Sequence, residues 1–170
     1  MGMVRTILFS VAMGFVLWVS GCGAARKEHG VGNSAEMERA IAALRGAYAA
    51  FNRGDIDAAV EVMDPAIEWS EPAEFPGGGT YHGREGAKQY LTASRNGLAE
   101  GTSEPERFLV SGDRIVVLVY AHVRPKGSNE WRDVRLADVY TFRGGKAIAM
   151  RAFADRAEAL RCVGLPADSR

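Results

Sequence analysis

Hydrophobic residues between positions 37 and 51 recur with the period of an α-helix. Successive spacings of four, three, four and three positions place on one helix face Met37, Ile41, Leu44, Tyr48 and Phe51. Ser34 lies where an N-cap is expected, and Gly54 lies where a C′ glycine ends a helix. The pattern therefore predicts an amphipathic helix that begins near residue 35 and ends before Gly54.

Two shorter helices are predicted after this one. Asp55 is a suitable N-cap for a helix over 56–63, which stops at Asp64-Pro65 because the residue before a proline disfavours helical dihedrals. A short extended segment, 67–70, precedes a loop over 71–79 that contains two prolines and three consecutive glycines. A third helix is predicted over 84–96.

The pattern changes after residue 106 to β-branched and aromatic runs. These runs cover 107–110, 114–124, 131–142 and 146–154, and turn-forming residues separate them. They predict three hairpins of an antiparallel sheet, followed by a short helix over 156–162. Helices first and a strand meander afterwards are typical of an α+β domain whose helices cover one face of the sheet. We expect one such domain over residues 35–162 and a polar tail over 163–170.

One acid lies on an apolar strand face. Alternation along the run 131–142 places Asp138 on the same face as Val134, Leu136, Tyr140 and Phe142. A carboxylate is costly to bury in such surroundings, so Asp138 must be protonated or paired. The pattern leaves two interpretations open: a functional site, or a structural carboxyl bonded to an arginine or a tyrosine.

A second acid, Glu71, lies beside Trp69 and before Pro72, at the start of the predicted loop. Two carboxyls in different environments can divide acid and base roles, one ionised and the other neutral. The alternative is that Glu71 is an ordinary loop acid. The two cysteines and three histidines have no zinc-binding spacing, and the chain has no phosphate loop and no Gly-x-Ser-x-Gly elbow. We therefore expect no metal and no cofactor.

Charge is distributed unevenly along the chain. Its 170 residues include 21 basic and 21 acidic side chains, so there is no basic excess to bind a nucleic acid. Residues 1–21, however, contain 14 hydrophobic side chains and a single charge, Arg5. Their apolar core, 7–19, is shorter than the ~20 residues of a membrane-spanning helix and is typical of a secretory signal.

The end of this segment, Val19-Ser20-Gly21-Cys22, resembles the lipobox of bacterial prolipoproteins. The resemblance implies that residues 1–21 are removed and that Cys22 is acylated; an ordinary cleaved signal is the alternative. Residues 22–34 are rich in glycine, alanine and charge and are predicted to form a flexible tether. We expect an exported lipoprotein anchored in a bacterial membrane, the outer one in a Gram-negative host because Gly23 is not a retention signal.

Several short motifs occur in an order that resembles the SnoaL-like and ketosteroid isomerase-like branch of the NTF2-like superfamily. The resemblance covers roughly residues 35–160 and rests on Ala50–Asp55, Glu71-Pro72, Tyr81–Gly86, Asp138–Phe142 and Met150–Ala152. It implies a cone of curved antiparallel sheet, wrapped by about three N-terminal helices around an apolar pocket. It also implies a homodimer packed through the sheet.

The resemblance implies roles for individual residues. Glu71 matches the general base of the isomerases, and Asp138 matches the neutral acid that donates to the developing enolate oxygen. The position of the family's second donor, a tyrosine on the first helix, matches Ala47, and Tyr48 lies ~100° further round that helix. This donor is therefore expected to be missing.

Aromatic residues are the expected ligand contacts. The predicted substrate-binding residues are Trp69, Tyr48, Tyr120 and Tyr140. The missing hydroxyl has four candidate replacements: Tyr81, Tyr90, Tyr120 and Tyr140.

Two functions are consistent with these features. The first is an acid/base isomerase or cyclase that acts on a small apolar or carbonyl-bearing molecule. The second is a noncatalytic binding or assembly module of the cell envelope, since this scaffold is used for unrelated functions. A wide cavity with both carboxyls inside it favours the first, whereas a cone filled by Trp69, Phe108 and Trp131 favours the second.

Overall fold

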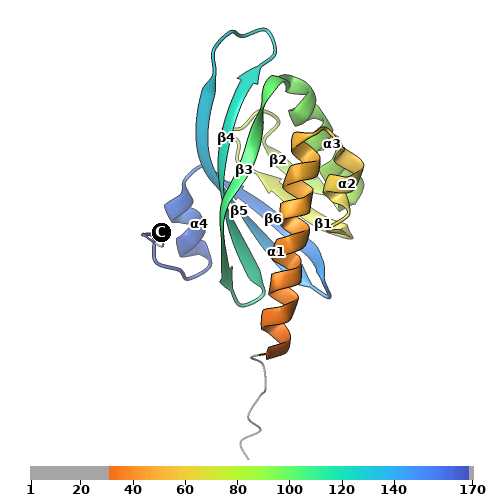
Figure 1. The fold of residues 1–170 in the computed structure, drawn as a ribbon, viewed down its shortest axis with the longest axis vertical. Helices are drawn as coiled ribbons and strands as arrows, with labels where there is room; N and C mark the ends of the chain where they lie inside the picture. The colour runs from red at the N-terminus through yellow and green to blue at the C-terminus, as the bar shows by residue number, and fades with distance from the viewer. Residues whose placement is uncertain (1–30, 169–170) are drawn as a thin grey trace, which may run out of the picture.

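A curved six-stranded β-sheet with helices on both faces makes up the fold (Figure 1). The structure is a computed structural model that describes residues 31–168; the predicted signal segment 1–21 and Cys22 lie outside these residues. In chain order its elements are α1 (Val31–Asn52), α2 (Ile56–Val60), β1 (Met63–Glu71), β2 (Gly79–His82), α3 (Gly83–Gly97), β3 (Leu98–Ser111), β4 (Arg114–Pro125), β5 (Arg132–Arg143), β6 (Lys146–Phe153) and α4 (Arg156–Cys162).

Helix α1 packs along the concave face of the sheet through the stripe that its periodicity predicts. Met37, Leu44 and Tyr48 are buried in the core on that side. The helix begins at Val31, inside the segment predicted to be a tether. Once a helix is nucleated by packing, each added residue costs little, so the helix extends beyond its buried part. Gly54 follows the last turn with a φ of +81°, as a C′ glycine does.

Helix α2 begins where Asp55 caps it, because the Asp55 side chain accepts a hydrogen bond from the backbone N–H of Ala58. It ends at Val60, three residues before the predicted end. The chain leaves the helix there because Met63 pairs with Ala147 of β6 and starts β1. Helix α4 occupies its predicted range.

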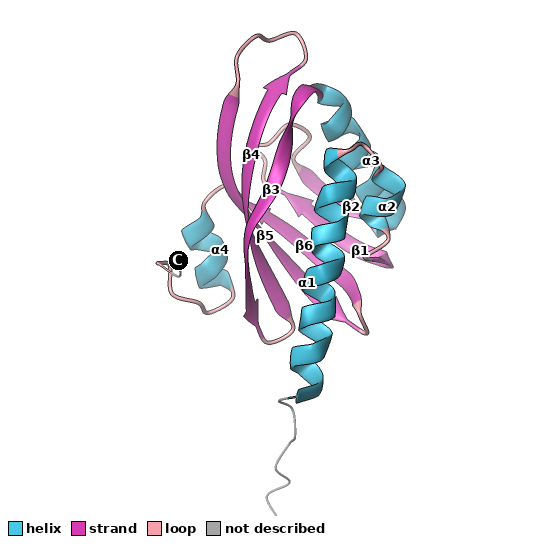
Figure 2. Ribbon diagram, viewed as in Figure 1, coloured by secondary structure: helices cyan, strands magenta, loops and turns pink. Residues whose placement is uncertain are grey.

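The strand order in the sheet is β2-β1-β6-β5-β4-β3 (Figure 2). Strands β3 to β6 form the predicted antiparallel meander, in which Asp138 of β5 lies between Val117 and Ala152. Strand β1, however, pairs in parallel with β6, with Trp69 opposite Met150. The sheet is therefore not wholly antiparallel. A long connection through β2, α3 and the meander brings the chain back beside β1 in the same direction.

Two extended segments have no clear signal in the sequence pattern. Strand β2 forms a hairpin with β1 and takes up the end of the predicted loop, with Glu71 opposite Gly79. Strand β3 begins at Leu98, nine residues before the predicted run, and its first half is polar. Gly101 and Pro105 read as loop residues in isolation, but both pair with the apolar strand β4, which holds this segment in the sheet.

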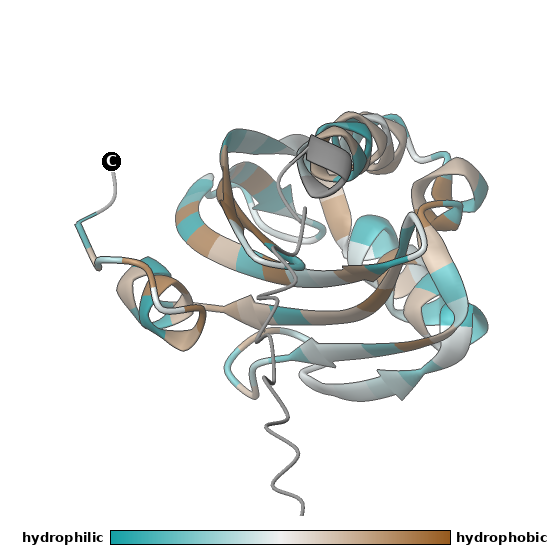
Figure 3. Ribbon diagram, turned by 90° about the horizontal axis from the view of Figure 1, so that it is seen from below, coloured by the Kyte–Doolittle hydropathy of each residue, from teal (hydrophilic) through white to brown (hydrophobic). Residues whose placement is uncertain are grey.

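Hydrophobic residues are buried on both faces of the sheet. The concave face, with Ile67 and Ile115, is covered by α1, α2 and α3, whereas Leu160 of α4 packs with Val139 on the convex face. Figure 3 shows the sheet curled beneath the first three helices, with α4 to one side. The concave side is the one to which alternation along β5 directs Asp138, so the fold encloses the acid that the strand pattern singles out.

Replacing Gly101 with alanine is expected to destabilise the protein by about 3 kcal/mol. Gly101 has a φ of +128°, and a Cβ there would lie 2.3 Å from the carbonyl oxygen of His122 in β4. The matched control is Gly112→Ala, because Gly112 has a φ of +65° but a Cβ there would meet no neighbouring atom. Urea denaturation should show a loss of only about 1 kcal/mol for the control. Equal losses would contradict a role for the close approach of β3 to β4.

Candidate functional site

A cavity of about 650 Å³ lies under the concave face of the sheet. This volume is within the range of small-molecule sites. Among the described residues that line it, the charged ones are Glu71, Arg132 and Asp138, so the two predicted catalytic acids share one cavity. Residues 31–168 contain no group of three or more acidic, histidine or cysteine side chains that could hold a metal ion.

Asp138 reaches the cavity from the middle of β5 and is 9% exposed. The hydroxyl of Tyr48, on α1, donates a hydrogen bond to its Oδ2. Burial raises the pKa of Asp138 to about 6, although the bond from Tyr48 favours the charged carboxylate and opposes that shift. The sequence expectation that this acid must be protonated or paired is therefore met by a tyrosine partner.

Glu71 reaches the same cavity from the end of β1. The indole N–H of Trp69 donates to its Oε1 at 2.8 Å. Burial raises the pKa of Glu71 to about 8, and the nearby charge of Asp138 adds to the shift, while hydrogen bonding to Trp69 and Tyr90 opposes it. Of the two acids, Glu71 has the more strongly raised pKa, so its surroundings favour the neutral form more than those of Asp138 do.

This order of ionisation is the reverse of the one that the family resemblance implies. The resemblance makes Glu71 the ionised base and Asp138 the neutral donor. In the structure, the Tyr48 hydroxyl stabilises charge on Asp138, and that charge in turn raises the pKa of Glu71. Two carboxyls in one apolar cavity cannot ionise independently, so a charge on Asp138 keeps Glu71 neutral over a wider pH range.

Tyr48 places a hydroxyl of α1 at Asp138, although the motif match to Ala47 predicts that a helix hydroxyl is missing from the site. Ala47 also lines the cavity, but Tyr48 is the residue of α1 that meets Asp138. The physical reason is the helix stripe: Tyr48 lies four residues after Leu44, on the face that packs against the sheet. The periodicity of α1 contained this signal, whereas matching by motif position pointed to Ala47. Burial, and then the charge of Asp138, raise the pKa of Tyr48 well above its ordinary value.

Four aromatic side chains complete the wall around the two acids. Trp69 and Tyr140, both predicted as ligand contacts, line the cavity with their ring centroids 6.3 Å apart. Tyr90 and Tyr81 line it as well, and the Tyr81 hydroxyl donates to the carbonyl of Gly77 at 2.5 Å, which ties the loop after β1 to β2. The sequence pattern predicts these two only as alternative hydroxyl donors, because neither lies on a strand with a regular alternation.

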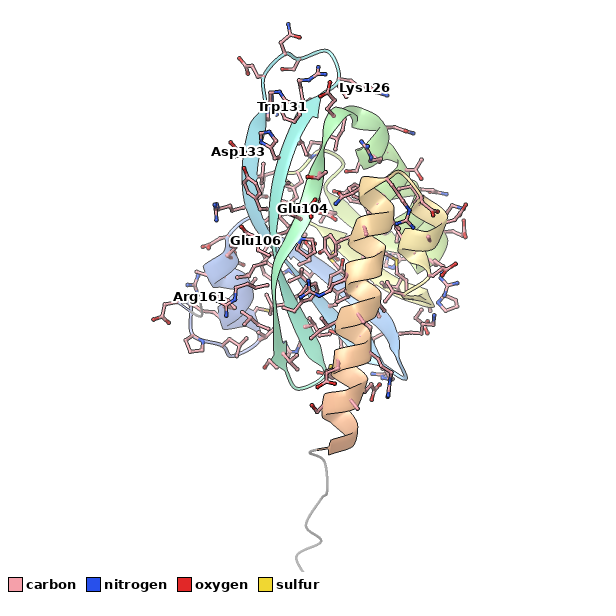
Figure 4. All side chains as sticks on the ribbon, viewed as in Figure 1. Glu104, Glu106, Lys126, Trp131, Asp133 and Arg161 are labelled. Atoms are coloured by element: carbon pink, nitrogen blue, oxygen red, sulfur yellow. The ribbon has the colours of Figure 1, made fainter. Side chains whose placement is uncertain are left out.

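Tyr120 does not belong to this site. Alternation along β4 places Val119 and Ala121 in the cavity wall and turns Tyr120 to the convex face, where its hydroxyl donates to Asp133 at 2.5 Å. Figure 4 shows Asp133 on the side of the β4–β5 hairpin away from α1. The strand register therefore corrects the prediction that Tyr120 is a substrate-binding residue.

The cone is not filled by the large side chains that the noncatalytic alternative requires. Trp131 is 45% exposed and stacks on His122 outside the cavity, with ring centroids 4.4 Å apart. Phe108 packs under the guanidinium of Arg45 and is not part of the cavity wall. Trp69 lines the cavity without closing it.

Comparison with known proteins places this architecture among familiar relatives. A model of the SnoaL-like domain matches residues 44–150. A search of curated proteins finds no match.

Solved structures share the fold along most of their length. TerC, co-crystallised with polyporic acid, is 27% identical, with 74% of this chain and 97% of TerC covered and a TM-score of 0.61. An NTF2-like protein of unknown function from Burkholderia pseudomallei is 26% identical, with coverage of 74% and 98% and a TM-score of 0.60. A ketosteroid isomerase-like protein from Catenulispora acidiphila, in complex with trimethylamine, is 18% identical, with coverage of 77% and 96% and a TM-score of 0.60, and shows the fold alone.

Tyr48→Phe is expected to raise the pKa of Asp138 above about 6, because the variant removes the hydrogen bond that favours the carboxylate. The measurement is a carbon-13 NMR titration of the Asp138 carboxyl. Tyr81→Phe is the matched control, since the Tyr81 hydroxyl bonds to a backbone carbonyl and not to an acid. An Asp138 titration that is identical in the wild type and in Tyr48→Phe would show that the bond does not tune this acid.

Glu71 should also make stability depend on pH. Its pKa is raised from 4.5 to about 8 by burial, so the native state binds more protons than the unfolded chain between these values. The free energy of unfolding then falls as pH rises through that window and levels off above it. Urea titrations at several pH values should show this loss relative to Glu71→Gln. The control, Glu74→Gln at an exposed position of the same loop, should follow the wild type; a wild-type profile parallel to that of Glu71→Gln would contradict the raised pKa.

Proposed function

Because this chain belongs to the SnoaL-like domain family, we propose that its cavity binds a small apolar, carbonyl-bearing molecule and that Glu71 and Asp138 move a proton on it. The largely apolar wall suits a hydrophobic ligand, and the two acids are the carboxyl groups in that wall. The solved structure of TerC with polyporic acid supports a small-molecule site.

One observation carries the catalytic part of the proposal: two carboxyls line one cavity, with pKa values raised by burial to about 6 and about 8. Acid/base catalysis is most effective when the pKa of the catalyst lies near the working pH. Between these two values the pair holds one proton, on Glu71, and one negative charge, on Asp138. The site therefore contains an acid and a base at once near neutral pH.

The proposed reaction starts when the carboxylate of Asp138 removes a proton from the carbon beside the ligand carbonyl. The electron pair of the broken C–H bond moves into the new C=C bond, and the carbonyl oxygen takes the proton of Glu71. In the second half, a ligand that carries a C=C bond conjugated with the new one takes the proton of Asp138 at the far carbon of that bond. The electron pairs shift along the dienol, the C=O bond re-forms, and Glu71 recovers its proton from the oxygen. The product is an isomer of the ligand, and both carboxyls regain their starting states.

The noncatalytic alternative gained weight from Ala47 and from the use of this scaffold for unrelated functions, and a filled cone would have favoured it. Tyr48 places a hydroxyl at Asp138, and the cavity remains open. These two observations favour proton-transfer chemistry. A protein that binds its ligand with both acids idle is the outcome that would restore the alternative.

Deuterium exchange beside the carbonyl of 1-tetralone, followed by NMR, tests the proposal. The exchange rate should be bell-shaped in pH, with limbs near 6 and 8, because Asp138 must be ionised and Glu71 protonated. Asp138→Asn and Glu71→Gln should each lower the rate by ~10²–10⁴.

The control is Tyr120→Phe on the convex face, which should exchange at the wild-type rate. A rate that keeps rising above about pH 8 would assign the base role to Glu71 and overturn the division of roles proposed here. Wild-type rates in both acid variants would overturn catalysis by this pair.

We also propose that the domain is held at a bacterial membrane by a lipid on Cys22. The proposal rests on the lipobox-like motif after an apolar segment. Within the described residues no helix is long and apolar enough to cross a membrane. Cys22→Ser should shift the protein from the membrane to the soluble fraction and abolish a lipid mass increment on residue 22. An unchanged distribution and mass would rule out lipidation.

A further inference from the structure

The inner end of the cavity contains acids and aromatic rings but no basic side chain. Among the described residues that line the cavity, the one base is Arg132, at the first position of β5. Six residues separate it from Asp138, or about 20 Å along the strand. Arg132 therefore marks the far end of the cavity and does not neutralise the acids.

Arginines on the surrounding helices are engaged elsewhere. Arg84 of α3 donates to the carbonyl oxygen of Met63, and Arg45 of α1 lies 4.4 Å from the ring centroid of Phe108. Arg95 of α3 has the carbonyl oxygen of Asn52 as its hydrogen-bond acceptor, at 3.4 Å. The groups that face the two acids are instead Tyr48 from α1, Tyr90 from α3, Trp69 from β1 and Tyr140 from β5.

The aromatic residues form a continuous wall. Trp69 lies 6.3 Å from Tyr90 and 6.3 Å from Tyr140, and Tyr90 lies 5.1 Å from Tyr81, all between ring centroids. The hydrogen bond from Trp69 to Glu71 fixes the indole beside a carboxyl. The faces of such rings carry partial negative charge, so they attract a cation that has weak hydration.

Two carboxyls and several ring faces together favour positive charge in this place. The carboxyls line a largely apolar cavity without a basic partner, and the charge of Asp138 raises the cost of ionising Glu71. Their raised pKa values, about 6 and about 8 with burial as the main cause, agree with this absence of a counter-charge. A cation bound between them would stabilise both charged forms.

We propose that the inner end of the cavity selects ligands with an alkylated ammonium group, held by Glu71, Asp138 and the faces of Trp69 and Tyr90. Alkylation matters because a primary ammonium needs three hydrogen-bond acceptors, whereas a tertiary or quaternary one exposes methyl groups to the ring faces. The inference rests on the proposed function only in that the cavity binds a small molecule.

A charged ligand and its neutral isostere provide the test. Benzyltrimethylammonium and neopentylbenzene have the same shape and differ by one positive charge. Each is titrated against the full chain, with displacement of the neutral fluorophore N-phenyl-1-naphthylamine as the readout. At pH 9 the cation should bind about tenfold more tightly than the neutral isostere. At pH 5.5, where the acids are protonated, its affinity should be about tenfold lower than at pH 9. The neutral isostere should show no such pH dependence.

Variants separate charge recognition from cavity binding. Glu71→Gln and Asp138→Asn should each reduce the preference for the cation while the fluorophore still binds, which also shows that the cavity has folded. Arg143→Ala, at the last position of β5 and outside the cavity wall, is the control and should keep the preference of the wild type within about twofold. Equal binding of cation and isostere at pH 9, or displacement by neither, overturns the inference. Continued binding of the fluorophore and exchange on 1-tetralone would leave the proposed function intact.

Discussion

The two carboxyls that share an apolar cavity cannot both be charged at low cost, and the site is arranged around this constraint. Alternation along β5 directs Asp138 to the concave face, where the hydroxyl of Tyr48 compensates part of its desolvation. Glu71, at the end of β1, is itself largely buried and lies near that negative charge, and both effects raise its pKa, to about 8. A fold that buries one acid in this way therefore sets the protonation state of the second.

The sheet brings these acids together from distant parts of the chain. Strand β1 pairs in parallel with β6, and β6 pairs with β5. This arrangement places Glu71, at the end of β1, in the same cavity as Asp138 of β5. Helix α1 then covers the concave face and contributes Tyr48. A catalytic and a noncatalytic protein can share this topology and differ only in the side chains inside the cone. The open cavity and its polar groups are therefore the evidence for function.

Local periodicity predicted the parts of the fold that pack against the core. The stripe on α1, the meander and the inward face of β5 all follow from side-chain spacing. Side-chain spacing does not predict strand β2, the first half of β3 or the parallel pairing of β1. These features depend on pairing with other strands of the sheet and not on the local pattern. Tyr48 was visible in the helix stripe, whereas the ionisation order of the acids depends on contacts that no single segment contains. The homodimer implied by the resemblance stays a prediction.

The central claim is that the two acids ionise in sequence, Asp138 before Glu71. Carbon-13 NMR titration of both carboxyls in the unmodified protein measures this order directly. We predict midpoints of about 6 for Asp138 and about 8 for Glu71, both raised by burial. Midpoints near 4 for both acids, or ionisation of Glu71 before Asp138, would contradict the account.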